Sequence, residues 1–180
     1  MATLFAENAE NLVFIDESNA KTNMARLCGW APRGARAHDS APHGHWCSNT
    51  MLAALRLGGP CAGMVVDCAT DGDVFEAFVT RALVPALLPG DLVVMDNLPA
   101  HKRAVVDRWI QACGARLLYL PAYSPDLNPI ERMWSKVKSI LRKLAARTVA
   151  ALHDAIAYAF RQITAEDARS FFENCGYIIS

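Results

Sequence analysis

The chain has 180 residues, of which 53% are hydrophobic and 20% are charged, and these proportions exclude disordered and fibrous proteins. A chain of this length buries enough surface for one compact core, so we expect a single domain over residues 1–180. The sequence has no secretory signal, no apolar run of membrane-spanning length and no CxxC pair among its six cysteines. These features predict a cytoplasmic protein with reduced thiols and no membrane partner.

The net charge is zero but is unevenly distributed along the chain. Residues 1–96 hold 6 Lys and Arg against 11 Asp and Glu, whereas residues 97–180 hold 12 against 7. This asymmetry is typical of a nucleic-acid enzyme in which an acidic metal-binding patch adjoins a basic surface. A chance imbalance on a solvated surface gives the same counts, so the motifs have to decide between the two.

The first part of the chain predicts strands. Residues 11–15 (NLVFI) are an apolar, β-branched run that indicates a buried strand ending at Asp16. Residues 17–44 are rich in turn-forming residues and predict an irregular excursion with one strand near Arg36. Residues 49–57 fit a strand or a short helix, and residues 63–66 fit a further strand after a Gly-Gly-Pro turn.

The middle of the chain alternates helix and strand. Apolar residues spaced by three and four positions over residues 74–83 predict an amphipathic helix. Residues 92–95 (LVVM) are the clearest buried strand of the sequence, and this strand ends at Asp96 as the first one ends at Asp16. A helix and a further strand over residues 116–120 (RLLYL) follow.

The last part of the chain predicts two helices. A proline-punctuated loop leads into a long helix that starts at Asn128, with Pro129 in the first turn, where proline is tolerated. A second helix covers residues 149–163, with Thr148 as its N-cap. This order predicts an α/β fold in which helices flank a mixed sheet and acids lie at the carboxyl ends of its strands.

Three acidic residues are candidate catalytic and metal-binding residues: Asp16, Asp96 and Glu131. The two aspartates converge if their strands are neighbours in one sheet, and Glu131 lies in the first turn of the long helix. Hard cations such as Mg²⁺ prefer oxygen ligands. A carboxylate triad therefore suits a pair of ions, about 3.5 to 4 Å apart, that catalyses phosphoryl transfer.

Each acid also has a purely structural interpretation. Aspartate is common at strand ends because it caps turns. Glu131 has the spacing of a capping box with Asn128, in which the glutamate reaches back to the backbone of the N-cap residue. Asp126 and Glu17 are further acids nearby in the sequence and are alternative members of the site.

The acids stand in longer motifs. Residues 14–18 (FIDES), 94–102 (VMDNLPAHK) and 120–134 (LPAYSPDLNPIERMW) each surround one of them. These three segments resemble the first, second and third acid motifs of DDE transposases in the mariner-like superfamily.

Further features extend the resemblance over nearly the whole chain. Residues 30–34 (WAPRG) and 176–177 (GY) resemble two other segments of the family. The 34 residues between Asp96 and Glu131 equal the family's DD34E spacing. The match is closest to members from bacterial insertion sequences.

The resemblance implies an RNase H-like fold and the catalytic domain of an insertion-sequence transposase. Such a domain cleaves DNA strands by metal-dependent hydrolysis, joins the freed 3′-OH to target DNA and works as a homodimer on DNA at the nucleoid. It implies two Mg²⁺ or Mn²⁺ ions, with Asp16 bridging both and Asp96 and Glu131 each completing one coordination sphere. Asn97 and His101 would position ligands or substrate, although a histidine that opens a helix also fits a structural role.

Basic residues follow Glu131 with no acid before Asp154. Lys138 and Arg142 share the helical side of Glu131, and that side is suited to following DNA phosphates. An ordinary solvated helix face gives the same pattern. The candidate DNA-binding residues are Lys102, Arg132, Lys136, Lys138 and Arg142.

A rival metal motif consists of His43, His45 and Cys47, because alternate residues of a strand point one way and these side chains bind zinc well. A polar strand edge explains the same pattern, and no fourth ligand stands at a familiar spacing. Cys68 departs from the family, whose members often carry glycine there, and this departure puts the local backbone geometry in question.

Mariner-like enzymes carry helix-turn-helix modules before the first acid strand, whereas only fifteen residues precede Asp16 here. We therefore expect the helix-turn-helix module to be absent from this chain and to be supplied by a partner or a frameshift fusion. Two other functions fit the sequence. One is an inactive transposase fragment that regulates by binding DNA or dimerising, and the other is an RNase H-like nuclease.

Overall fold

A mixed five-stranded sheet forms the centre of the computed structural model, which describes residues 8–40, 42–97, 103–121 and 124–179. The strand order is β3-β2-β1-β4-β5. The strands are β1 (Leu12–Lys21), β2 (Ser48–Arg56), β3 (Gly59–Val66), β4 (Leu92–Met95) and β5 (Arg116–Tyr119). β2 pairs antiparallel with β1 and β3, whereas β4 pairs parallel with β1 and β5.

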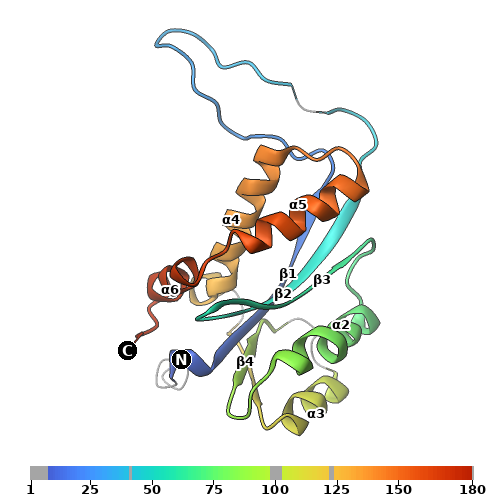
Figure 1. Ribbon diagram of the computed structural model, residues 1–180, viewed down its shortest axis with the longest axis vertical. Helices are drawn as coiled ribbons and strands as arrows, with labels where there is room; N and C mark the ends of the chain where they lie inside the picture. The colour runs from blue at the N-terminus through green and yellow to red at the C-terminus, as the bar shows by residue number, and fades with distance from the viewer. Residues whose placement is uncertain (1–7, 41, 98–102, 122–123, 180) are drawn as a thin grey trace.

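Helices cover both faces of this sheet (Figure 1). On one face lie α4 (Pro129–Leu144), α5 (Val149–Arg161) and α6 (Ala165–Asn174), and on the other lie α2 (Gly72–Phe78) and α3 (Ala104–Ala112). α2 continues through a π-helical turn (Val79–Leu83) and a 3₁₀ turn (Val84–Ala86), and two more 3₁₀ turns cover Ala9–Asn11 and Pro125–Leu127. The predicted mixed sheet flanked by helices is confirmed. Within the described residues, no helix combines the length and the apolar character that a membrane span requires.

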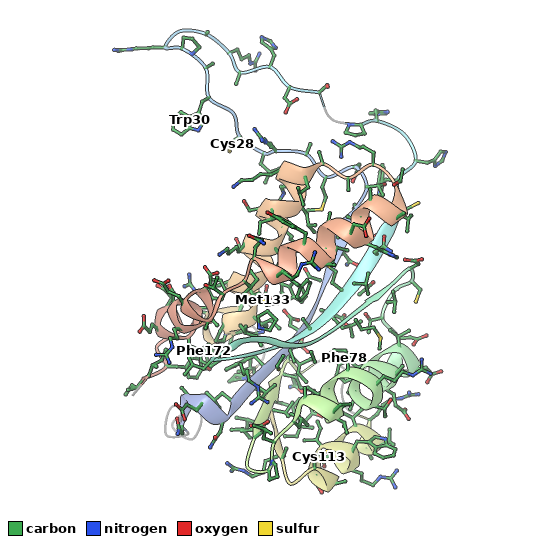
Figure 2. All side chains as sticks on the ribbon, in the orientation of Figure 1. Cys28, Trp30, Phe78, Cys113, Met133 and Phe172 are labelled. Carbon is green, nitrogen blue, oxygen red and sulfur yellow. The ribbon has the colours of Figure 1, made fainter. Side chains whose placement is uncertain are left out.

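The two helical layers enclose two separate cores, because successive residues of a strand face opposite sides of the sheet. In β1, Phe14 packs toward α4, α5 and α6, whereas Ile15 packs toward α2 and α3. Figure 2 shows Met133 and Phe172 in the first layer and Phe78 in the second.

β1 is longer than the sequence predicts. The prediction that it ends at Asp16 is wrong, since the strand continues to Lys21 through residues 16–21 (DESNAK). These polar residues adopt strand geometry because each pairs with β2, in a ladder that ends at Lys21 and Ser48. Residues 49–57, which the sequence leaves open between strand and helix, form most of β2 because they pair with β1.

The chain between β1 and β2 projects from the body of the protein (Figure 1). No strand forms in its described residues, 23–40 and 42–46, so the strand predicted there is wrong. Leu27 and Trp30 are exposed on this excursion, and Figure 2 shows the Trp30 side chain away from the core. A strand lacks a partner at this distance from the sheet.

α6 was not predicted from the sequence. Its N-terminus carries a complete capping box. The side chain of Thr164 accepts from the backbone N–H of Asp167, and the side chain of Asp167 accepts from the backbone N–H of Thr164. Its inner face contributes Phe172, whose ring lies 5.4 Å from Phe14 and 5.7 Å from Tyr177 between ring centroids. This aromatic cluster fastens the C-terminal segment to the first strand of the sheet.

Candidate active site

The parallel pairing of β1 with β4 brings Asp16 and Asp96 to the same level of the sheet. Leu12 pairs with Leu92 and Phe14 with Val94. Continuing this register by two residues puts Asp16 beside Asp96. Because side chains alternate along a strand, both carboxylates face the same side of the sheet as Phe14, the side covered by α4.

Glu131 lies in the first turn of α4, which crosses this face of the sheet. One turn later on the same helix, the indole Nε1 of Trp134 donates a hydrogen bond of 3.1 Å to Oδ2 of Asp16. Trp134 is buried, and its ring packs edge-on against Phe160 with centroids 5.9 Å apart. A rigidly packed indole therefore orients the Asp16 carboxylate, and α4 links Glu131 directly to β1.

The electrostatics of Asp16 indicate that the three acids converge. The pKa of Asp16 is raised from 3.8 to about 7, chiefly by burial and then by the negative charges of Glu131 and Asp96. Hydrogen bonds from the Glu17 backbone and from Trp134 act in the opposite direction without cancelling this effect. Such mutual repulsion between carboxylates is relieved by protonation or by a cation between them.

The donor chemistry of the triad fits a hard divalent cation, since carboxylate oxygens are the ligands that Mg²⁺ and Mn²⁺ prefer. Among the described residues, no three His, Cys, Asp or Glu side chains are already gathered tightly enough to hold a metal ion. The backbone nevertheless brings the three acids close enough for the charges of Glu131 and Asp96 to act on Asp16.

The structural interpretations of Glu131 and its neighbours are not supported. Asn128 is the N-cap of α4 but its side chain caps no backbone group, so the predicted capping-box alternative is wrong. Glu17 faces the opposite side of β1 from Asp16, as its pairing with Leu52 of the second core indicates. Burial and then the charge of Asp126 raise the pKa of Cys175 at the end of α6. Asp126 is not among the charges that raise the pKa of Asp16.

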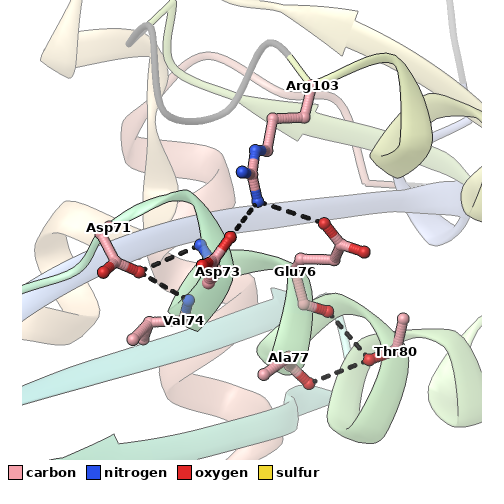
Figure 3. Close-up of polar contacts among 7 residues, drawn as sticks. All are labelled: Asp71, Asp73, Val74, Glu76, Ala77, Thr80 and Arg103. Carbon is pink, nitrogen blue, oxygen red and sulfur yellow. Dashed lines mark hydrogen bonds and ion pairs between the residues drawn. The ribbon is translucent and has the colours of Figure 1, made fainter.

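The segment after Asp96 leads toward α3. Asn97 is exposed and directly follows Asp96, whereas His101 and Lys102 lie outside the described residues. Where the described chain resumes, Arg103 forms ion pairs of 2.7 Å with Asp73 and 3.2 Å with Glu76, both on α2 (Figure 3). These contacts join the residue before α3 to α2.

The basic residues of α4 separate into two groups. Arg132 donates to the carbonyl oxygen of Asn174 at 3.3 Å, and Lys136 is paired with Asp167, so both are engaged with α6. Lys138 and Arg142 are half-buried on another side of the helix. Neither of them forms an ion pair or hydrogen bond with any described residue.

The rival zinc motif does not assemble. His43, His45 and Cys47 are exposed, and no group of three or more metal-ligating side chains exists in the described part of the chain. The backbone at Cys68 is ordinary, because Ala145 is the one non-glycine residue with a positive φ among those described. A glycine is therefore not required at Cys68.

Sequence reasoning missed the role of Trp134. The helical spacing of Trp134 assigns it to the apolar stripe, and its ring is indeed buried there. Its position three residues after Glu131 places it close to the third acid, but the contact with Asp16 follows only from the packing of α4 on β1.

Comparisons with known proteins agree with this architecture. A family model described as DDE superfamily endonuclease matches residues 11–153. The Tc1 transposase of Caenorhabditis elegans is 34% identical over 91 residues, which are 51% of this chain and 33% of the relative.

Solved structures with this fold include two complexes of Mos1 transposase. The paired-end complex with the left transposon end has a TM-score of 0.76 at 16% identity, covering 93% of this chain and 52% of that one. The paired-end complex with Mn has a TM-score of 0.75 at 14% identity, covering 97% and 58%. This likeness confirms the RNase H-like fold.

The chain spans about a third of the Tc1 relative and about half of the Mos1 chain. The family model covers most of the present sequence, including Asp16, Asp96 and Glu131. The chain therefore belongs to the DDE superfamily endonucleases.

Proposed function

We propose that this chain is the catalytic domain of a mariner/Tc1-type transposase that cleaves DNA strands and transfers the freed 3′-OH. The observation that carries the proposal is the convergence of the Asp16, Glu131 and Asp96 charges, which acts with burial to raise the pKa of Asp16 to about 7. Three acids whose charges converge at one face of the sheet are expected of a site that binds divalent ions and phosphate.

Each residue of the site has a defined part in this proposal. Asp16 would contact both ions, and Asp96 and Glu131 would each complete the coordination of one. Two bound Mg²⁺ or Mn²⁺ ions would supply charge neutralisation for the attacking and leaving oxygens of an in-line displacement. Trp134 would fix the orientation of the Asp16 carboxylate through its indole N–H, as partners of metal ligands commonly do.

The finer assignment rests on sequence. The likeness of the acid motifs to those of bacterial members supports an insertion-sequence enzyme of bacterial type. We further propose that the unit of residues 1–180 acts as one catalytic domain and that it dimerises on DNA. Asn97, His101 and Lys102 are proposed to position substrate beside the acids.

Nicking of supercoiled plasmid in Mn²⁺ tests the proposal. The wild-type chain, alone and fused to a helix-turn-helix partner, is expected to nick the plasmid in Mn²⁺ or Mg²⁺ but not in EDTA. Asp96→Asn is expected to abolish nicking because it removes a ligand charge. The matched control is Asp154→Asn, since Asp154 is an exposed acid on α5.

Two outcomes would overturn the proposal. Nicking that survives Asp96→Asn would show that the acids do not carry the reaction. Salt-sensitive DNA binding without any ion-dependent nicking, in either form of the protein, would instead support the regulatory fragment.

A further inference from the structure

A groove lined by cations lies beside the C-terminal half of α4. The cavity has a volume of about 540 Å³ and lies between α4 and the chain that leaves β1. Figure 1 shows this end of α4 next to the base of the excursion. Its charged lining residues are Lys21, Arg26, Lys138 and Arg142, and none of the described residues that line it is acidic.

The four cations of this groove lack counter-ions within the described part of the chain. Lys138 and Arg142 are half-buried, and no acidic side chain of the described chain pairs with either of them. Elsewhere in the protein a half-buried cation is paired, as Lys136 is with Asp167. A groove that concentrates unpaired positive charge is a binding site for an anion.

The groove is aligned with the acid site along one side of α4. Lys138 and Arg142 follow Glu131 by seven and eleven residues, which are about two and three helical turns, so the three side chains share one helical face. At about 1.5 Å per residue, the two cations lie roughly 10 and 16 Å from Glu131 along the helix axis. One rigid helix therefore sets the spacing between the acids and the groove.

The opposite wall of the groove is fixed to the body of the protein. Arg147, just after α4, donates to the carbonyl oxygens of Thr22 at 3.1 Å and Met24 at 2.8 Å. The Lys21 ammonium lies 5.9 Å from the centroid of the Trp46 ring, on the returning arm of the excursion. These contacts hold the chain over residues 21–24 against α4, so the groove is a built feature.

We infer that this groove binds backbone phosphates of the DNA strand on which the acids act. The inference rests on the proposed function, because it takes DNA as the substrate. A strand rises about 3.4 Å per nucleotide in B-form DNA, so the 10 to 16 Å spacing corresponds to about three to five nucleotides. The groove binds the substrate strand about three to five nucleotides from the reacting phosphate and makes no contact with the bases.

The test compares two double variants that remove the same charge. The groove variant carries Lys138→Gln and Arg142→Gln, and glutamine keeps part of each aliphatic stem. The control variant carries Lys143→Gln and Arg108→Gln, which are exposed residues outside the groove. Binding of a fluorescein-labelled, random-sequence DNA duplex is followed by anisotropy over a KCl titration in EDTA, after circular dichroism has verified folding.

The salt dependence gives the expected result. Each lost phosphate contact lowers the slope of log affinity against log salt by about 0.9. The groove variant should therefore lose about 2 from the slope and bind roughly 50-fold more weakly at about 0.1 M salt, while the control keeps the wild-type slope. Either single groove substitution should lower the slope by about 1, which gives a second test if the double variant does not fold.

The inference and the proposed function fail separately. A groove variant with the wild-type slope, or a control that loses as much slope, overturns the groove as a phosphate site, whatever the nicking assay shows. Absence of DNA binding by the wild-type chain also overturns it. Nicking that survives Asp96→Asn overturns the proposed function even if the salt slopes differ as expected.

Discussion

Replacing Asp16 with asparagine tests how much the burial of this acid and the charges around it destabilise its ionised form. In the folded protein, burial and then the charge of Glu131 raise the pKa of Asp16 from 3.8 to about 7. An acid whose folded pKa is raised contributes its full stability below the unfolded value of 3.8 and loses it as pH rises through about 7. At 1.36 kcal/mol per pKa unit, ionised Asp16 costs the metal-free fold about 4 kcal/mol by pH ~8.

Asparagine has nearly the same shape, can still accept from the Trp134 indole, and never ionises. Urea denaturation in EDTA at pH ~4 and pH ~8 measures the free energy of unfolding in both proteins. Between these pH values the wild-type protein should lose about 4 kcal/mol relative to Asp16→Asn. Added Mg²⁺ at the higher pH should stabilise the wild-type protein but not the variant. Parallel pH profiles for the two proteins would refute the reasoning, and Asp154→Asn should follow the wild-type profile.

Three further substitutions probe the supports of the site. Trp134→Phe removes the donor to Asp16, so we expect a loss of about 1 to 3 kcal/mol and a still higher pKa of Asp16, read from the pH profile of unfolding. An unmoved profile would argue against the bond. Phe172→Ala should cost about 3 to 5 kcal/mol in urea denaturation because the ring is fully buried, and a loss below about 1 kcal/mol would contradict the docking of α6. Asp91→Ala leaves the Arg56 guanidinium without its 3.0 Å partner at the start of β4, so we expect a loss of about 3 kcal/mol, which Asp91→Asn should partly restore.

The fold was predictable where local pattern and tertiary environment agree. The run over residues 92–95 is apolar throughout and becomes the buried β4. By contrast, residues 16–21 are polar except for Ala20 and form strand because β2 pairs with them, which the local pattern does not reveal. α6 has a readable capping box at Thr164, but its helix is held by contact of Phe172 with Phe14, far away in sequence.

The candidate site was predictable as a set of acids but not as a set of contacts. Resemblance singled out Asp16, Asp96 and Glu131, and the sheet register then brings the two aspartates to one level. The bond from Trp134 to Asp16 joins residues 118 positions apart, so helical spacing alone does not reveal it.

The basic run of α4 shows the same limit. In sequence, Lys136 and Lys138 are equivalent candidates for DNA binding. Only the position of α6, which places Asp167 beside Lys136, distinguishes the paired lysine from the unpaired one. Charge patterns therefore predict which helix is basic, and packing decides which of its charges are available.

The excursion between β1 and β2 leaves the sheet and returns to it at neighbouring points. The backbone N–H of Thr22 donates to the carbonyl oxygen of Cys47 at 3.1 Å, and the N–H of Cys47 donates to Oγ1 of Thr22 at 3.1 Å. Because Thr22 and Cys47 join the two ends of the excursion, the number of residues between them does not affect the strand register that positions Asp16. Lengthening a loop whose ends are already joined costs little free energy. The excursion is thus a site at which evolution or engineering can insert, shorten or exchange sequence while leaving the geometry of the acids intact.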